Sequence, residues 1–256
     1  MNLLTNDIVE RFYGFLWPML RISALLLSAP VFSLRSLNLR LRILLAVALT
    51  WMIYPLYSWP RLDPLSAVGL LEIFNQIAIG LLMGLSLQII TAAILLAGQS
   101  VSNAMGLSIA NMMDPNLGNV PVIAQFLLIL STLVFLGMGG HAMMLSLVVD
   151  SFTSLPVGQP LFTEKSWAHF LSWSSMIFLG AVLLALPVMV TLLFINIGLG
   201  VATRAAPSLN IFQVGLPAMI IVGFGALIFS LPSMGARIEW LWLQGFLEVR
   251  SQLGLK

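Results

Sequence analysis

Few residues of this chain could do chemistry, and two of them lie where charge is costly. The chain has 11 basic and 9 acidic residues, and only Arg21 and Glu72 lie inside long apolar stretches. An arginine at the centre of a lipid-facing helix costs about 2.5–3.5 kcal/mol, so such a residue usually packs against a partner or faces water. We expect a structural ion pair of Arg21 with Glu72 or Asp150. A proton relay is the alternative, but the chain has few acids to build one.

Other reactive groups are scarce. Cysteine is absent, which excludes disulfides, thiolate metal sites and cysteine nucleophiles. The two histidines, His141 and His169, are too few for a histidine metal cluster. The sequence has no phosphate-binding loop, HExxH or GxSxG motif. We therefore predict a protein that is not an enzyme and that binds no metal or cofactor.

Apolar residues dominate the chain. Hydrophobic residues make up 60% and charged residues 8%, whereas soluble domains are about a quarter charged. Amphipathic helices of soluble proteins carry polar residues every few positions, and the long apolar stretches do not. The sequence predicts an all-α, polytopic membrane protein without nucleic-acid binding. The stretches are Phe12–Phe32, Ile43–Tyr57, Gly69–Ala97, Val120–Val149, Phe170–Ala202 and Ile211–Leu231.

Two of these stretches do not match the thickness of a membrane. Ile43–Tyr57 would form a helix of about 22 Å and Phe170–Ala202 one of about 50 Å, against a hydrocarbon core of about 30 Å. We expect Pro187 to kink or break the longer one. The mismatch favours helices that pack within a protein assembly.

Small residues interrupt the apolar stretches. Gly80 and Gly84 form a GxxxG motif, which lets helix backbones approach closely. Tight helix packing is the simplest interpretation. Glycine- and proline-interrupted helices also line the substrate paths of transporters, so a secondary transporter for a small solute is an alternative.

The semi-polar segment Gly98–Pro121 lies between two of the longest apolar stretches. It contains Met105, Met112 and Met113. Methionine is flexible and polarizable, so such a segment could close a wide pore and still yield to varied cargo. An ordinary surface connection, with a turn at Asp114-Pro115-Asn116, is favoured equally by the spacing alone.

Several short sequence blocks occur in a fixed order over essentially the whole chain. They are AGQ at Ala97–Gln99, MGLSIA at Met105–Ala110, Asp114-Pro115, GGH at Gly139–His141, LVVDSFTSLPVG at Leu147–Gly158 and RAAPSLNIFQVGLP at Arg204–Pro217. In these blocks the chain resembles the FliR/SctT family of type III export-gate subunits. The part of the last block with the sequence APSLNIF is the most specific.

The resemblance implies helical hairpins packed in a cone-like gate. The gate contains FliP-like and FliQ-like subunits, associates with an FlhB-like subunit and passes unfolded flagellar proteins. It lies in the bacterial inner membrane at the flagellar basal body, in contact with lipid and largely on the periplasmic side. Residues 1–165 would correspond to a FliP-like part with a plug loop at about 98–121, and residues 166–256 to a FliQ-like hairpin and tail. Use in an injectisome is the alternative within the family.

The resemblance also assigns site residues. The expected plug residues are Gly106, Leu107, Ser108, Asn111, Met112, Met113, Asp114 and Pro115. The expected structural and assembly residues are Arg21, Gly80 and Gly84, from the charge within an apolar stretch and the GxxxG spacing, and Pro207, Asn210 and Phe212, from the matching block.

Overall fold

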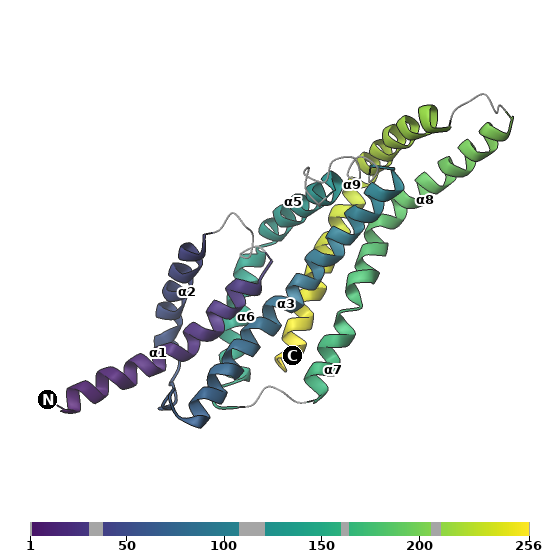
Figure 1. Ribbon diagram of the computed structural model, residues 1–256. Helices are drawn as coiled ribbons and strands as arrows, with labels where there is room; N and C mark the ends of the chain where they lie inside the picture. Colours follow the sequence, from purple (N-terminus) through teal and green to yellow (C-terminus); the bar gives the residue numbers. More distant parts are fainter. Residues whose placement is uncertain (1, 31–37, 108–120, 160–163, 206–210, 256) are drawn as a thin grey trace. The chain divides into compact units, whose positions relative to one another are not determined.

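All regular elements in the described part of the chain are helices, which confirms the all-α prediction (Figure 1). The computed structural model describes residues 2–30, 38–107, 121–159, 164–205 and 211–255. Its helices are α1 (Asn2–Ser28), α2 (Leu39–Ile53), the short 3-10 helix η1 (Tyr54–Leu56), α3 (Ala67–Ala104), α5 (Val122–Gly137), α6 (Gly140–Ser154), α7 (Glu164–Trp173), α8 (Met176–Ala205) and α9 (Ile211–Gln252).

The described helices include four that are long and apolar enough to cross a membrane, which confirms the polytopic membrane class. A fifth span results if the broken pair α5 and α6 counts as one. The span Leu39–Leu56 has 18 residues and is about 27 Å long. Helix α2 itself has 15 residues, the number on which the predicted length was based. The longer span results because the helix begins before the apolar run, at Leu39, and because η1 extends it.

Three helices are much longer than a bilayer core of about 30 Å. Helices α3, α8 and α9 have 38, 30 and 42 residues, which correspond to about 57, 45 and 63 Å. Helix α9 continues through Pro232, so the residues after Leu231 are not the separate tail that the sequence suggested. Helices of this length extend beyond the lipid core, so part of their apolar surface is expected to contact protein.

Sequence analysis expected Pro187 to kink or break the Phe170–Ala202 stretch, and the expected break at this position was wrong. Helix α8 runs on through Pro187, and the stretch is divided instead at Ser174–Ser175. A helical proline cannot donate to the carbonyl four residues earlier, here that of Leu183. Arg237 of α9 donates to this Leu183 carbonyl from its Nη1 atom, so the orphaned acceptor has a partner.

The break between α5 and α6 was not predicted. Gly139 precedes α6 with a left-handed backbone, φ +75°. Glycine adopts this conformation at little cost because it has no Cβ. The stretch Val120–Val149 therefore contains a break between two helices, although its sequence is continuously apolar.

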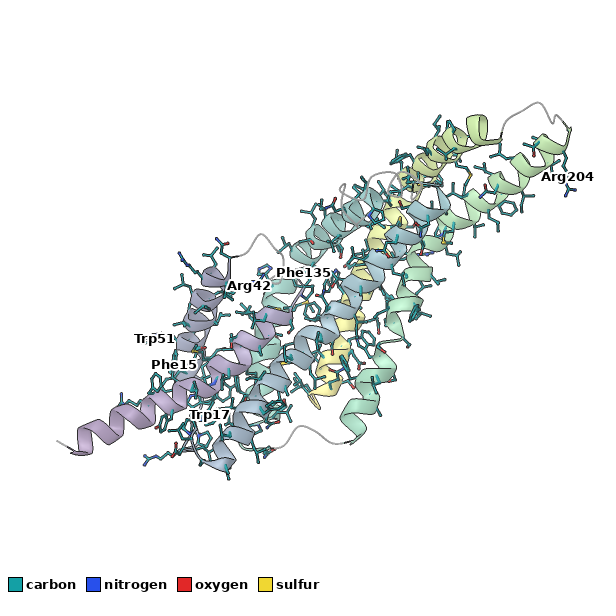
Figure 2. All side chains as sticks on the ribbon, viewed as in Figure 1. Phe15, Trp17, Arg42, Trp51, Phe135 and Arg204 are labelled. Atoms are coloured by element: carbon teal, nitrogen blue, oxygen red, sulfur yellow. The ribbon has the colours of Figure 1, made fainter. Side chains whose placement is uncertain are left out.

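The chain forms two compact units, and α3 and α9 contribute residues to both. One unit comprises Met1–Ile89, Gly139–Ser174 and Gln244–Lys256, and the other comprises Ile90–Met138 and Ser175–Leu243. In the first, Trp17 of α1 is completely buried, whereas Trp51 of α2 is 76% exposed (Figure 2). In the second, Trp242 Nε1 donates to Ser131 Oγ at 3.0 Å, and its ring lies 4.7 Å from that of Phe135.

Candidate functional site

Arg21 is the centre of a buried polar network in the first unit. Its side chain is only 1% exposed. Its Nε atom donates to Gln76 Oε1 at 2.8 Å. Its Nη1 atom donates to the carbonyl and the hydroxyl of Ser151 at 2.8 and 3.0 Å, and Nη2 donates to the Leu155 carbonyl at 2.8 Å. The guanidinium thus joins α1, α3 and the end of α6.

The position of Arg21 at the end of α6 has an electrostatic reason. The last carbonyls of a helix lack amide partners, and the helix dipole places partial negative charge there. Helix α6 ends at Ser154, so the Ser151 and Leu155 carbonyls belong to this terminus. The Ser151 carbonyl already accepts from the Leu155 amide at 3.0 Å, so Arg21 gives it a second donor. Arg21 also supplies a donor to the Leu155 carbonyl and brings positive charge to the end of α6.

Glu72 acts on Arg21 through Gln76. Gln76 Nε2 donates to Glu72 Oε1, which also accepts from the Gly158 amide at 2.9 Å. Glu72 Oε2 accepts from Asn75 Nδ2 at 3.4 Å. The amide side chain of Gln76 therefore stands between the cation and the buried carboxylate.

This arrangement differs from the direct ion pair that the sequence suggested. Among the described residues, no hydrogen bond or ion pair joins Arg21 to Glu72 or Asp150 directly. Sequence reasoning missed Gln76, which lies one helical turn after Glu72. It also missed Ser151, although Ser151 lies in the block Leu147–Gly158 that carried the family resemblance.

Aromatic rings enclose the Arg21 network. The guanidinium carbon lies 4.2 Å from the centroid of the Phe152 ring, a geometry that favours a cation. The Trp59 ring packs edge-on to Phe152 at 5.3 Å. Tyr57 donates its hydroxyl to the Val149 carbonyl at 2.8 Å. The network is therefore a rigid structural junction that keeps water away from the charge.

Gly80 and Gly84 lie where α3 meets α1. A Cβ on Gly80 would lie 2.3 Å from the Arg21 carbonyl oxygen, and one on Gly84 would lie 1.9 Å from Ser28 Oγ. Distances this short show that only glycine fits without displacement of α1. This is the close helix approach that the GxxxG spacing predicts.

Gly106 ends helix α3 in a Schellman motif. Its φ is +77°, its amide donates to the Asn103 carbonyl at 3.0 Å, and the Leu107 amide donates to the Ser102 carbonyl at 3.1 Å. This pair of bonds defines the motif, with glycine at the left-handed position. The structure thus places Gly106 and Leu107 at the start of the expected plug segment, as a fixed helix end.

The expected plug residues beyond this cap lie outside the described part of the chain. These are Ser108, Asn111, Met112, Met113, Asp114 and Pro115. Pro207 and Asn210 also lie outside it, and Phe212 belongs to the first turn of α9. In the second unit, the buried Met105 side chain fills the space over Gly223, whose Cβ would lie 2.6 Å from it.

The two histidines, His141 and His169, both lie in the described part of the chain. His141 is exposed in the first turn of α6. His169 Nδ1 lies 2.9 Å from Glu248 Oε1. Within the described ranges, no group of three His, Asp or Glu side chains could hold a metal ion.

Comparison with known proteins identifies close relatives over most of the chain. The family model for bacterial export proteins, family 1, matches residues 12–244. Flagellar biosynthetic protein FliR of Pectobacterium carotovorum subsp. carotovorum is 38% identical over 94% of this chain and 92% of the relative. The proteins of that name from Escherichia coli (strain K12) and Bacillus subtilis (strain 168) are 35% and 33% identical. They align with 91% and 87% of this chain and with 89% and 88% of their own lengths.

Proposed function

Because the chain belongs to the bacterial export proteins, family 1, and is a component of the flagellar type III export gate, we propose that it lines the pore and carries the plug that closes it. It is not an enzyme. The observation that carries this proposal is the match to FliR proteins over about nine-tenths of the chain. The three relatives described above are flagellar, which favours the flagellum over an injectisome.

The surface of the helices supports a role inside an assembly. Helix α8 exposes apolar side chains such as Phe178 and Phe194, and α9 exposes Phe229 at 91%. Apolar surfaces of this extent mark contacts with lipid or with other proteins. Since α8 and α9 are longer than a bilayer core, part of this surface requires protein neighbours. We assign these neighbours as FliP-like and FliQ-like subunits, with an FlhB-like subunit associated with the gate.

The division of the chain follows from the same proposal. Residues 1–165 form the FliP-like part, and residues 166–256 form the FliQ-like hairpin of α8 and α9. The gate lies in the bacterial inner membrane, with much of the assembly on the periplasmic side. Pro207, Asn210 and Phe212 would contribute to assembly.

The anchoring of the segment at residues 98–121 supports its role as the plug. Residues 98–104 of this segment are the last turns of α3; the chain leaves α3 through the Gly106 cap and enters α5 at Val122. Helices α3 and α5 are in close contact, because a Cβ on Gly98 would lie 2.3 Å from the Ala124 Cα atom. A segment held at both ends by two packed helices can close an opening while its centre yields to cargo.

A crosslinking experiment tests the pore and plug roles. The natural chain contains no cysteine, so single cysteines can be placed at Met112, Met113 and Asn116 in an otherwise unchanged protein. An export substrate that carries one cysteine and a folded domain that stalls in the gate should form disulfide crosslinks with these positions under oxidising conditions. The same variants with a substrate that passes freely serve as the control. Absence of crosslinks to the stalled substrate at all three positions would contradict the proposal.

A further inference from the structure

Arg237 has more charge and more hydrogen-bond donors than its contact within the chain uses. It lies on α9 in the second unit, and its Nη1 atom donates to the Leu183 carbonyl of α8. A guanidinium has five N–H donors and a positive charge. A carbonyl oxygen accepts a hydrogen bond but does not neutralise the charge, and a neutral side chain such as glutamine could donate to it as well. The charge of Arg237 therefore needs a further explanation.

No acidic side chain in the described part of the second unit pairs with Arg237. The described residues of this unit are 90–107, 121–138, 175–205 and 211–243. Glu239 is the only acid among them. It is exposed and lies two positions after Arg237, and side chains two positions apart on a helix do not face each other. An arginine within an apolar helix usually pairs with another group or faces water. Arg237 thus lacks, among these residues, the carboxylate that would balance its charge.

A pocket of about 240 Å³ lies beside the guanidinium. It is lined by Leu183, Arg237, Trp240 and Leu241, all of which belong to the second unit. Small-molecule sites usually have about 300–1,000 Å³, so this pocket fits a single side chain better than a ligand. Its lining combines one cation with leucine and tryptophan side chains. These surroundings suit the aliphatic stem and the charged end of an aspartate or a glutamate.

The apolar surface around the pocket also favours a protein neighbour. Leu179 and Leu186 lie one helical turn before and after Leu183 on α8, and they are 54% and 48% exposed. On α9, Trp240 is 42% exposed. Tryptophan and arginine are enriched among the residues that contribute most to protein interfaces. An apolar helix of a neighbouring subunit could cover this surface and bring a carboxylate to Arg237.

We propose that Arg237 binds one acidic side chain, an aspartate or a glutamate, on an apolar helix of a neighbouring subunit of the gate. The carboxylate enters the pocket and accepts hydrogen bonds from the guanidinium, whose planar donors match it in bidentate geometry. Its aliphatic stem packs against Trp240 and Leu241. The inference rests on the protein neighbours proposed above, and it adds the chemical group that fixes their register along α8 and α9.

Covalent coupling in the assembled complex tests this contact. Arg237→Lys places a primary amine at the site, and an apolar carbodiimide activates carboxylates so that an amine in contact displaces the urea and forms an amide. The variant is co-purified with its partner subunits, treated with the carbodiimide and analysed by mass spectrometry of peptides. We expect an amide between position 237 and one aspartate or glutamate of a partner subunit. If Arg237→Lys does not assemble, Ser233→Lys, at an exposed position one turn earlier, serves as the probe.

Two kinds of variant serve as controls. Arg40→Lys, at an exposed position of α2, measures background coupling and should form no amide with a partner subunit. Arg237→Gln removes the charge but keeps a donor for the Leu183 carbonyl, and it should raise the dissociation rate of the partner subunit about thirtyfold or more. Exchange of the coupled acid for arginine should restore the partner in Arg237→Glu, a rescue that a purely structural role of Arg237 would not give.

Several results would overturn the proposal. An amide from position 237 to Glu239, or to Asp114 outside the described residues, would show a pair within the chain. An assembled complex in which neither lysine couples to a partner would show that no carboxylate reaches the pocket, while the pore and plug roles would stand. Loss of an anionic phospholipid from Arg237→Gln, with its partner subunits retained as in the wild type, would show a lipid site. A chain that purifies without partner subunits would instead contradict the proposed function, and this contact with it.

Discussion

Arg21 Nη1 and the backbone carbonyl oxygen of Ser151 are 2.8 Å apart, and this hydrogen bond attaches helix α1 to the end of helix α6. The same guanidinium reaches α3 through Gln76. One buried cation therefore joins three helices that are far apart in the sequence. The charge that sequence analysis found out of place in an apolar stretch is a structural junction.

Replacement of Arg21 by leucine should destabilise the protein strongly. The change removes the Arg21 donor of the Leu155 carbonyl and one of the two donors of the Ser151 carbonyl, which still accepts from the Leu155 amide at 3.0 Å, and it leaves the Glu72–Gln76 pair without its cation. Removal of one member of a buried charged network costs about 3–5 kcal/mol. We expect a large fall in the melting temperature of the purified complex and in its amount in membranes. Arg40→Leu, at an exposed position, is the matched control and should change the melting temperature little.

Replacement of Gly80 by alanine should separate α1 from α3. The new Cβ would lie 2.3 Å from the Arg21 carbonyl oxygen, and overpacking of this kind costs about 1–3 kcal/mol. Gly235→Ala in α9 is the control, because its Cβ would meet nothing within 4 Å and alanine favours helix by about 0.5–1 kcal/mol. Thermal unfolding of both variants should show shifts of opposite sign. A stabilising Gly80→Ala change would contradict the close contact.

Arg237 and Pro187 should show energetic coupling. In Pro187→Ala the amide at position 187 can donate to the Leu183 carbonyl, so this carbonyl no longer depends on Arg237. Arg237→Leu should therefore cost less stability in the Pro187→Ala background than in the wild type. A double-mutant cycle on melting temperature measures the difference, for which contacting residues give about 0.5–3 kcal/mol. Strict additivity of the two changes would show that Arg237 does not support this carbonyl.

Replacement of Gly106 by alanine should strain the end of α3. A residue with a Cβ in the left-handed conformation costs about 1–2 kcal/mol, whereas asparagine tolerates it better. We expect the order glycine, asparagine, alanine in thermal stability, with no change in partner subunits. Equal stability of the alanine and asparagine variants would argue against the cap. A cap variant that also leaks ions would link this helix end to closure of the pore.

The sequence predicted the membrane class of the protein correctly, but it did not predict where the helices are interrupted. Long apolar stretches with few charges specify membrane helices directly, and the Gly80–Gly84 spacing predicts a close helix contact. The effect of Pro187 could not be predicted, because the residue that satisfies the freed carbonyl is Arg237, 50 positions later in the sequence. The break at Gly139 was missed because the run is apolar on both sides and only its glycines signal a boundary.

The sequence predicted that Arg21 has polar partners, but it did not predict which groups these partners are. A charge within an apolar stretch must have polar partners, and this much follows from sequence. Two of the partners are backbone carbonyls at the end of α6, which any residue type can supply. Gln76 is neutral, so it was not considered when only acidic residues were sought as partners of Arg21.

The most direct test of the account is the membrane permeability of a variant that lacks Asn111–Asn119. The measurement is the leak of small ions across the membrane of cells, or of liposomes, that contain the assembled gate with this deletion. If the segment is the plug, the variant should assemble with its partner subunits and leak ions that the wild-type gate retains. An assembled variant whose membrane stays as tight as the wild type would contradict the claim.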